Sequence, residues 1–193
     1  MKKFIIFIIV LILSFILLIK GSTHLYQHEY HHITSIFLSC STIVIINFLV
    51  FKYMFKNVKF KWTAIITYTL LITYLIFCLS PRENNFKSSK IKEEYNDLHP
   101  ILRIGVGTLF LFDRNSIMTD GSRTQADCER MNIHYKSDHM VREDGYCYAI
   151  DIAVKGRSEI RNWLVGLYFS TMGYYTLRHD QGFGDHYHIS LKR

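Results

Sequence analysis

Three long apolar runs in the first half of the chain constrain its fold more than any other feature. They cover residues 4–19, 33–51 and 62–79, and none of them contains a charged side chain. Each approaches the roughly 20 residues that a helix needs to span the hydrocarbon core of a bilayer. A soluble chain of 193 residues cannot bury three helices that are apolar on every side. We therefore expect three transmembrane helices, with the lipid bilayer as a partner.

The distribution of lysines predicts how these helices are oriented. The loop between the second and third runs carries four lysines, whereas the loop after the first run carries only Lys20. Because positively charged loops stay in the cytoplasm, the second loop and the N-terminus should be cytoplasmic. We expect a multi-pass protein of the cytoplasmic or inner membrane, with its C-terminal domain in the periplasm or on the cell-wall side. If the first run is instead a cleaved signal peptide, the C-terminal domain still lies outside.

The second half of the chain has a different composition. The net charge is +7, but the basic excess lies in residues 1–92, so nucleic-acid binding is not expected. Residues 81–96 are polar and charged, as in a linker that leaves the membrane, and residues 97–193 should form one small domain. We expect an α+β fold with a mainly antiparallel sheet. Its helices should lie within 98–112, 124–133 and 158–174, and its strands within 116–119, 147–154, 176–178 and 186–191, the last preceded by a glycine-rich loop at 181–184.

Alternation within two of these strands predicts which side chains face a site. Over 147–154 the bulky residues occupy every second position, which leaves Asp151 on the opposite face among small neighbours. Over 186–191 the same alternation places His186 and His188 on one face. Asp151 and His188 should therefore project from one sheet surface. His139 should reach them from a loop, because Gly145 breaks the chain in between.

These residues carry a resemblance to a known family. The patterns are Ser137-x-His139, Ala149-x-Asp151, Asp185-x-x-His188 and, upstream, Asp120-Gly-Ser-Arg123-Thr. They resemble the zinc peptidases that include lysostaphin, the D-Ala-D-Ala carboxypeptidases and the Hedgehog signalling domain. They are most similar to the branch of D-Ala-D-Ala carboxypeptidases and phage L-alanyl-D-glutamate endopeptidases. The resemblance covers about residues 97–191. His139 and Asp151 lie farther apart than that pattern has them, so an insertion must loop out between them.

The resemblance implies a membrane-anchored zinc metallopeptidase that hydrolyses peptidoglycan stem peptides with zinc-activated water. It implies His139, Asp151 and His188 as the Zn²⁺ ligands and Asp185 as the general base, although strand alternation alone would choose His186. Arg123 would orient the substrate and stabilise the oxyanion, while His186 and Ser137 would contact the substrate. Two alternatives stay open: a non-catalytic zinc- or peptidoglycan-binding module of the same fold, and a structural, holin-like membrane protein.

The cysteines and the remaining histidines give only weak indications of further sites. Cys128 and Cys147 both lie in the outer domain, and the sequence leaves open whether they form a disulfide. Four histidines gather between the first two apolar runs, where we expect a polar loop rather than a metal site; they are His24, His28, His31 and His32.

Overall fold

A computed structural model describes residues 2–55, 57–132, 137–179 and 184–192 of the chain. The chain divides into two compact units, Met1–Phe77 and Cys78–Lys192. The expected glycine-rich loop at 181–184 falls almost wholly outside the described residues, as does the end of the helix expected over 124–133.

The first unit consists of apolar helices. They are α1 (Lys2–Gln27), α2 (His32–Met54) and α3 (Phe60–Leu79), and the last two residues of α3 belong to the second unit. Within these helices, Ile8–Gln27, His32–Met54 and Phe60–Leu79 are long and apolar enough to cross a membrane, as the sequence predicted. Polar contacts connect the three helices inside this unit. The Ser14 hydroxyl donates to the Asn47 Oδ1 atom at 3.2 Å, and the Asn47 Nδ2 atom donates to Thr67 at 3.4 Å.

The segment 81–96 is folded, which differs from the expected linker. It contains η1 (Glu83–Asn85), α4 (Ser89–Glu94) and η2 (Tyr95–Asp97), all within the second unit. Tyr95 is fully buried, and its hydroxyl donates to the Cys78 carbonyl at 2.7 Å. Glu94 reaches the turn after the first strand, where its Oε2 atom accepts a hydrogen bond from the Gly121 backbone. The polar composition that suggested a linker therefore belongs to a short helix with a buried inner side.

The sheet of the second unit has four antiparallel strands. They are β1 (Met118–Asp120), β2 (Ala149–Ala153), β3 (Tyr175–His179) and β4 (His186–Ser190), in the order β1-β2-β4-β3. The expected α+β fold with an antiparallel sheet is confirmed for the described residues. β2 and β4 occupy the centre of the sheet, and four of the five residues of β2 are buried, including Ile150 and Ile152.

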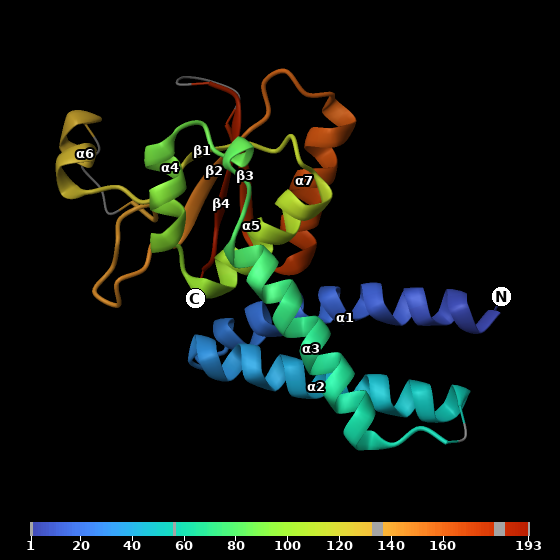
Figure 1. Ribbon diagram of the computed structural model, residues 1–193. Helices are drawn as coiled ribbons and strands as arrows, with labels where there is room; N and C mark the ends of the chain where they lie inside the picture. Colours follow the sequence, from blue (N-terminus) through green and yellow to red (C-terminus); the bar gives the residue numbers. More distant parts are fainter. Residues whose placement is uncertain (1, 56, 133–136, 180–183, 193) are drawn as a thin grey trace. The chain divides into compact units, whose positions relative to one another are not determined.

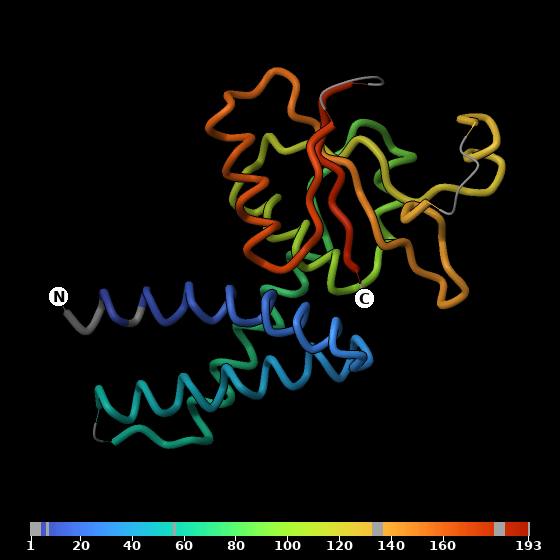
Figure 2. The backbone as a smooth tube through the Cα atoms, turned by 180° about the vertical axis from the view of Figure 1, so that it is seen from behind, coloured from blue at the N-terminus to red at the C-terminus, as the bar shows by residue number. Residues whose placement is uncertain are grey.

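Helices lie on both sides of this sheet. Figures 1 and 2 show α5 (Pro100–Phe112) and α7 (Glu159–Met172) on one side, with α4 and α6 (Gln125–Arg130) on the other. Local signals set the ends of these helices. Ser158 caps α7 through the Arg161 backbone N–H, and Gly173 ends it with a left-handed φ of 96°. The α7 side of the sheet also holds Tyr187, whose hydroxyl lies against Gly166. The residues of β4 that alternate with Tyr187 therefore face away from α7.

Candidate metal centre

Two of the three predicted ligands face each other across the central strand pair. Asp151 on β2 is the register partner of His188 on β4. Directly opposed residues of antiparallel strands project to the same face of the sheet. That face lies opposite the α7 side, because His188 alternates with Tyr187. The predicted juxtaposition of Asp151 and His188 is therefore confirmed.

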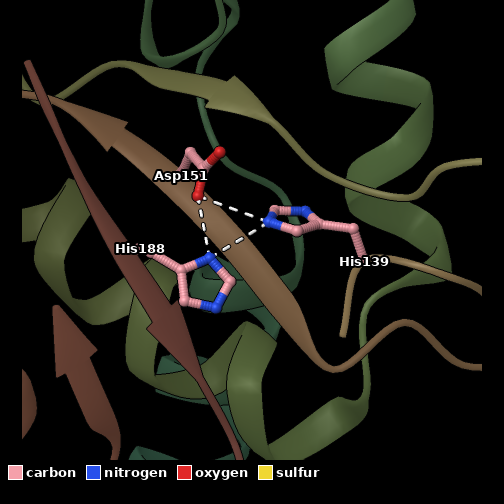
Figure 3. Close-up of side chains that lie close together, drawn as sticks. All are labelled: His139, Asp151 and His188. Carbon is pink, nitrogen blue, oxygen red and sulfur yellow. Dashed lines mark hydrogen bonds and ion pairs between the residues drawn. The ribbon is translucent and has the colours of Figure 1, made fainter. Parts of the chain in front are cut away.

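The third predicted ligand, His139, comes from a loop (Figure 3). Several contacts outside the triangle fix its position. Its backbone N–H donates to the Ser137 hydroxyl at 3.3 Å, and its carbonyl accepts a hydrogen bond from the Arg123 backbone at 2.8 Å. Its Nδ1 atom lies 2.7 Å from the Gly121 carbonyl oxygen. A carbonyl oxygen only accepts, so we assign the ring proton to Nδ1, which leaves a lone pair on the Nε2 atom of neutral His139. Metal-binding histidines are typically oriented by such a contact of the other nitrogen.

The three candidate ligand atoms form a nearly equilateral triangle. The distances are 3.2 Å from His139 Nε2 to His188 Nδ1, 3.1 Å from His188 Nδ1 to Asp151 Oδ1, and 3.3 Å from His139 Nε2 to Asp151 Oδ1. A tetrahedral zinc ion with ligand distances of about 2.0–2.1 Å separates neighbouring ligand atoms by about 3.3 Å. The spacing of these atoms thus fits a single small metal ion.

The hydrogen-bonding chemistry of the triangle also favours a cation. Asp151 Oδ1 and His139 Nε2 both present lone pairs to each other. With His139 neutral, a proton on His188 Nδ1 leaves no proton between His139 Nε2 and Asp151 Oδ1. A metal ion would satisfy all three atoms at once, and these residues therefore fit a metal.

Electrostatics keep the carboxylate of the triangle ionised. Burial opposes ionisation of Asp151, but hydrogen bonds with His139 and His188 more than offset this, and the pKa of Asp151 lies well below its usual range. Burial also lowers the pKa of His139, yet the hydrogen bond and the charge of Asp151 raise it overall. At neutral pH the site thus presents an anionic oxygen, which is the form that binds a metal, and a proton that Asp151 holds on His139 would be released when a metal binds.

The site is enclosed on one side and accessible on the other. His139 and Asp151 are buried, whereas the side chain of His188 is 18 % exposed. Within the described part of the chain, one group of metal-ligating side chains lies close enough together to hold a metal ion. It consists of His139, Asp151 and His188. Three protein ligands with an accessible side are typical of a catalytic zinc site, which keeps a coordination position for water or substrate.

Arg123 borders the site but is mostly engaged within the protein. Its Nε atom donates to Asp120 Oδ2 at 2.7 Å, and its Nη2 atom also contacts that oxygen. The same Nη2 atom lies 3.7 Å from Asp151 Oδ2, and the side chain is 14 % exposed. The segment Asp120–Arg123 thus orients His139 through Gly121 and places a positive charge beside the Asp151 carboxylate. The expected contact of Arg123 with substrate stays a prediction.

His186 and Asp185 lie on different sides of the sheet. The His186 Nε2 atom is 3.7 Å from Asp151 Oδ2, so His186 borders the metal centre. The Asp185 carboxylate instead accepts hydrogen bonds from Arg178 Nε at 3.0 Å and Nη2 at 2.7 Å. Arg178 is the register partner of Tyr187 and therefore lies on the α7 side. The Arg178 hydrogen bonds also lower the pKa of Asp185, which makes this carboxylate a weaker base. The geometry supports His186, and not Asp185, as the titratable group beside the site.

The other predicted contacts are internal. Ser137 is buried, and its hydroxyl accepts from the His139 backbone, so the structure gives it a positioning contact. Cys128 and Cys147 are both buried and free, so the structure lacks the disulfide that the sequence left open. Burial raises the pKa of the Cys147 thiol to about 12, which keeps it protonated and unsuited as a ligand.

Two residues near the site were missed by the sequence analysis. His179 on β3 is the register partner of His186, and the two ring centroids lie 5.0 Å apart. The strand expected from the sequence ended at residue 178. Extending its period-two alternation by one residue would have predicted that His179 faces the site. Glu94, which holds the Gly121 backbone, lies in the supposed linker, and no local signal connects it with the site.

Comparisons with protein-family models, with curated proteins and with solved structures found no match for this chain.

Proposed function

We propose that the second unit is a zinc-dependent peptidase that hydrolyses peptide bonds in peptidoglycan stem peptides. The observation that carries this proposal is the triangle formed by His139, Asp151 and His188, whose edges of 3.1–3.3 Å fit one zinc ion. When bound, zinc would supply an activated water nucleophile and polarise the scissile carbonyl.

The surrounding residues have separate tasks in this proposal. Gly121 fixes the tautomer of His139, and Arg123 keeps a positive charge near Asp151. His186, which lies 3.7 Å from Asp151 Oδ2, is the group best placed to move a proton at its Nε2 atom. The partly exposed His188 marks the side from which a peptide approaches.

The substrate class depends on the residue patterns and on the membrane helices. The order of Asp120-Gly-Ser-Arg123, His139, Asp151 and His188 is similar to that of the peptidases acting on L-alanyl-D-glutamate or D-Ala-D-Ala bonds. Helices able to span a membrane would hold such an enzyme beside the cell wall. A soluble cytoplasmic substrate would not require this anchor.

The test uses the purified full chain in detergent. We expect about one zinc per chain by elemental analysis, and cleavage of peptidoglycan fragments at a stem-peptide bond by mass spectrometry. His188→Ala should lose both zinc and turnover. His179→Ala is the matched control, because His179 lies on the neighbouring strand outside the triangle, and it should keep its zinc.

Each possible outcome of this test supports a different function or ligand set for the site. Zinc binding without turnover of any fragment would support the non-catalytic binding module instead. A different metal, such as iron, bound by the same residues would contradict the zinc assignment but not the site. Full zinc content in His188→Ala would show that the ligand set is wrong.

The proposed location of the domain outside the cytoplasm has its own test. The lysines between α2 and α3 favour a cytoplasmic position for that loop. A reporter that is active only outside the cytoplasm should therefore give a signal when fused after Arg193. A signal only from a fusion within residues 52–61 would reverse this topology.

A further inference from the structure

The outward side of α7 carries an exposed apolar stripe. The inner residues Val165 and Phe169 are buried in the domain. The outward residues repeat at helical spacing and are strongly exposed: Ile160 (75 %), Trp163 (61 %), Leu164 (52 %) and Leu167 (46 %). A contiguous apolar face of this kind on a folded domain marks an interaction surface.

The stripe continues onto the end of α5. A groove of about 390 Å³ between the two helices is lined by Phe112 and Leu164, among others, and Phe112 is 79 % exposed. The Tyr168 hydroxyl donates to the Gly105 carbonyl at 2.9 Å, which holds α7 against α5. We call Phe112, Ile160, Trp163, Leu164 and Leu167 together the apolar face.

The end of the third membrane helix is built into this same unit. Cys78, one residue before the end of α3, packs so closely on α5 that a Cβ atom at Gly107 would lie 2.4 Å from the Cys78 carbonyl oxygen. Tyr95 and Arg103 also donate to the carbonyls of Cys78 and Leu79. Cys78 and Leu79, the last two residues of α3, are thus packed within the second unit.

The contacts within the second unit limit how far the apolar face lies from the end of α3. The apolar run of α3 ends at Leu79, which places that residue near the membrane–water interface if α3 spans the bilayer. Gly107 on α5 lies against Cys78, the residue before Leu79, and is therefore close to the end of α3. Phe112 follows five residues later on α5, which is about 7.5 Å of helix. Phe112, the first residue of the apolar face, therefore lies within one or two helical turns of the end of α3.

We propose that the apolar face docks on the surface of the bilayer in which this chain is anchored. Trp beside Leu, Ile and Phe is the composition that favours the headgroup boundary. A second copy of the chain would have to be recruited at a cost in translational and rotational freedom. The bilayer needs no such recruitment, because α3, if it spans the membrane, ends at Leu79 within the same unit as the apolar face. The inference requires that α3 spans the membrane, and it is independent of the proposed peptidase activity.

Docking would give the metal centre a fixed direction. α7 packs on the sheet face that holds Tyr187, whereas Asp151 and His188 project from the opposite face. With the outer side of α7 on the lipid, the metal centre faces away from the membrane. Substrate would then reach it from the aqueous side.

The test uses the fluorescence of Trp163 in the full chain reconstituted in liposomes. The chain has two tryptophans, so Trp62→Phe leaves Trp163 as the reporter. We expect blue-shifted emission that is quenched by brominated lipids and protected from iodide in water. Alkaline extraction first shows that the chain is integrated, so that failed insertion is distinguished from failed docking.

A control reporter and a patch variant make the test specific. Leu177→Trp, in a chain with both native tryptophans replaced by Phe, reports from the face that holds His188, because Leu177 is the register partner of His188 and is 42 % exposed. Brominated lipids should quench it several-fold less than Trp163. The double variant Ile160→Gln, Leu164→Gln should reduce the quenching of Trp163.

Three outcomes would overturn the proposal. The first is emission of Trp163 at the wavelength of aqueous tryptophan with ready quenching by iodide. The second is equal lipid quenching of Trp163 and of the Leu177→Trp control reporter. The third is a blue shift without lipid quenching that disappears in nanodiscs holding one chain each, which would assign the apolar face to a second copy.

Discussion

The Nδ1 atom of His139 lies 2.7 Å from the carbonyl oxygen of Gly121, eighteen residues upstream. This contact joins a candidate metal ligand to the turn after β1. The Gly121 N–H in turn donates to Glu94 Oε2, which secures the turn from α4. The orientation of His139 is therefore sensitive to changes in residues that do not touch the metal position.

A methyl group at position 121 should weaken metal binding. In Gly121→Ala the new Cβ atom would lie 2.6 Å from Met118 Cε and 3.0 Å from Glu94 Cβ, so the buried Met118 side chain, Glu94 or the turn itself must move. We expect zinc affinity to fall by about 10- to 100-fold, the usual effect of disturbing such a supporting contact. Competition with a zinc chelator measures the affinity. Ser122→Ala is the control, because its hydroxyl bonds Asp97 at the surface, and unchanged affinity in Gly121→Ala would show that the Gly121 contact is dispensable.

Replacement of His186 should reduce peptide hydrolysis more than replacement of Asp185. His186→Ala removes the imidazole nearest to Asp151 Oδ2 and should lower the rate by about 10²–10⁴, the size of a general acid–base contribution. Asp185→Asn weakens only the contacts with Arg178 and should change the rate little. Zinc content is measured in both variants. The opposite ranking would restore Asp185 as the base, as the sequence resemblance implied.

Asp113 should stabilise the second unit in a pH-dependent manner. Its carboxylate accepts from Ser116 at 2.8 Å and from Arg161 Nε at 3.1 Å, and it also pairs with Arg157. Burial raises the pKa of Asp113, but the hydrogen bonds from Arg161 and Ser116 and the charges of both arginines lower it overall. Because the folded pKa is depressed, the stabilisation is present above the unfolded value of about 3.9 and disappears as the pH falls through the folded value.

Asp113→Asn should therefore destabilise the unit by about 2 kcal/mol near neutral pH. The difference from the natural chain should shrink below about pH 4. Thermal unfolding in detergent, followed by near-ultraviolet circular dichroism, measures it. Glu159→Gln removes an exposed partner of Arg178 and should have a smaller effect. A difference for Asp113→Asn that persists unchanged at low pH would contradict the ion-pair explanation.

The cysteines should be reduced and unreactive in the folded chain. Cys128 and Cys147 are buried, and burial raises the pKa of Cys147 to about 12, so little thiolate forms at neutral pH. Iodoacetamide should add nothing to these two residues in the native chain. In denaturant without reductant it should modify both, as peptide mass spectrometry can measure. Protection of this pair until a reductant is added would reveal a disulfide.

The sequence was informative where alternation alone decides a side chain's direction. Asp151 and His188 were assigned to one sheet surface from period-two patterns, and the register confirms this. The three apolar helices followed from length and composition, which need no tertiary information. Both kinds of inference rest on local geometry.

The assignments that required tertiary contacts were less successful. Residues 81–96 looked like a linker because most of their side chains are polar, yet Tyr95 and Glu94 connect this segment to the core and the site. Asp185 was assigned by its distance along the chain from His188, but a cross-strand arginine holds it on the other side of the sheet. No pattern within the last strand predicts the position of Arg178.

The pairing of Asp151 with His188 makes metal binding a check on how the sheet has assembled. A slip of one residue between β2 and β4 would turn His188 away from Asp151 and bring Tyr187 or Ile189 into its place. Such a misfolded sheet would retain many of its backbone hydrogen bonds but lose one corner of the triangle. A metal ion would therefore select the correctly aligned chain during folding, and metal content would report the fraction of molecules with the right register.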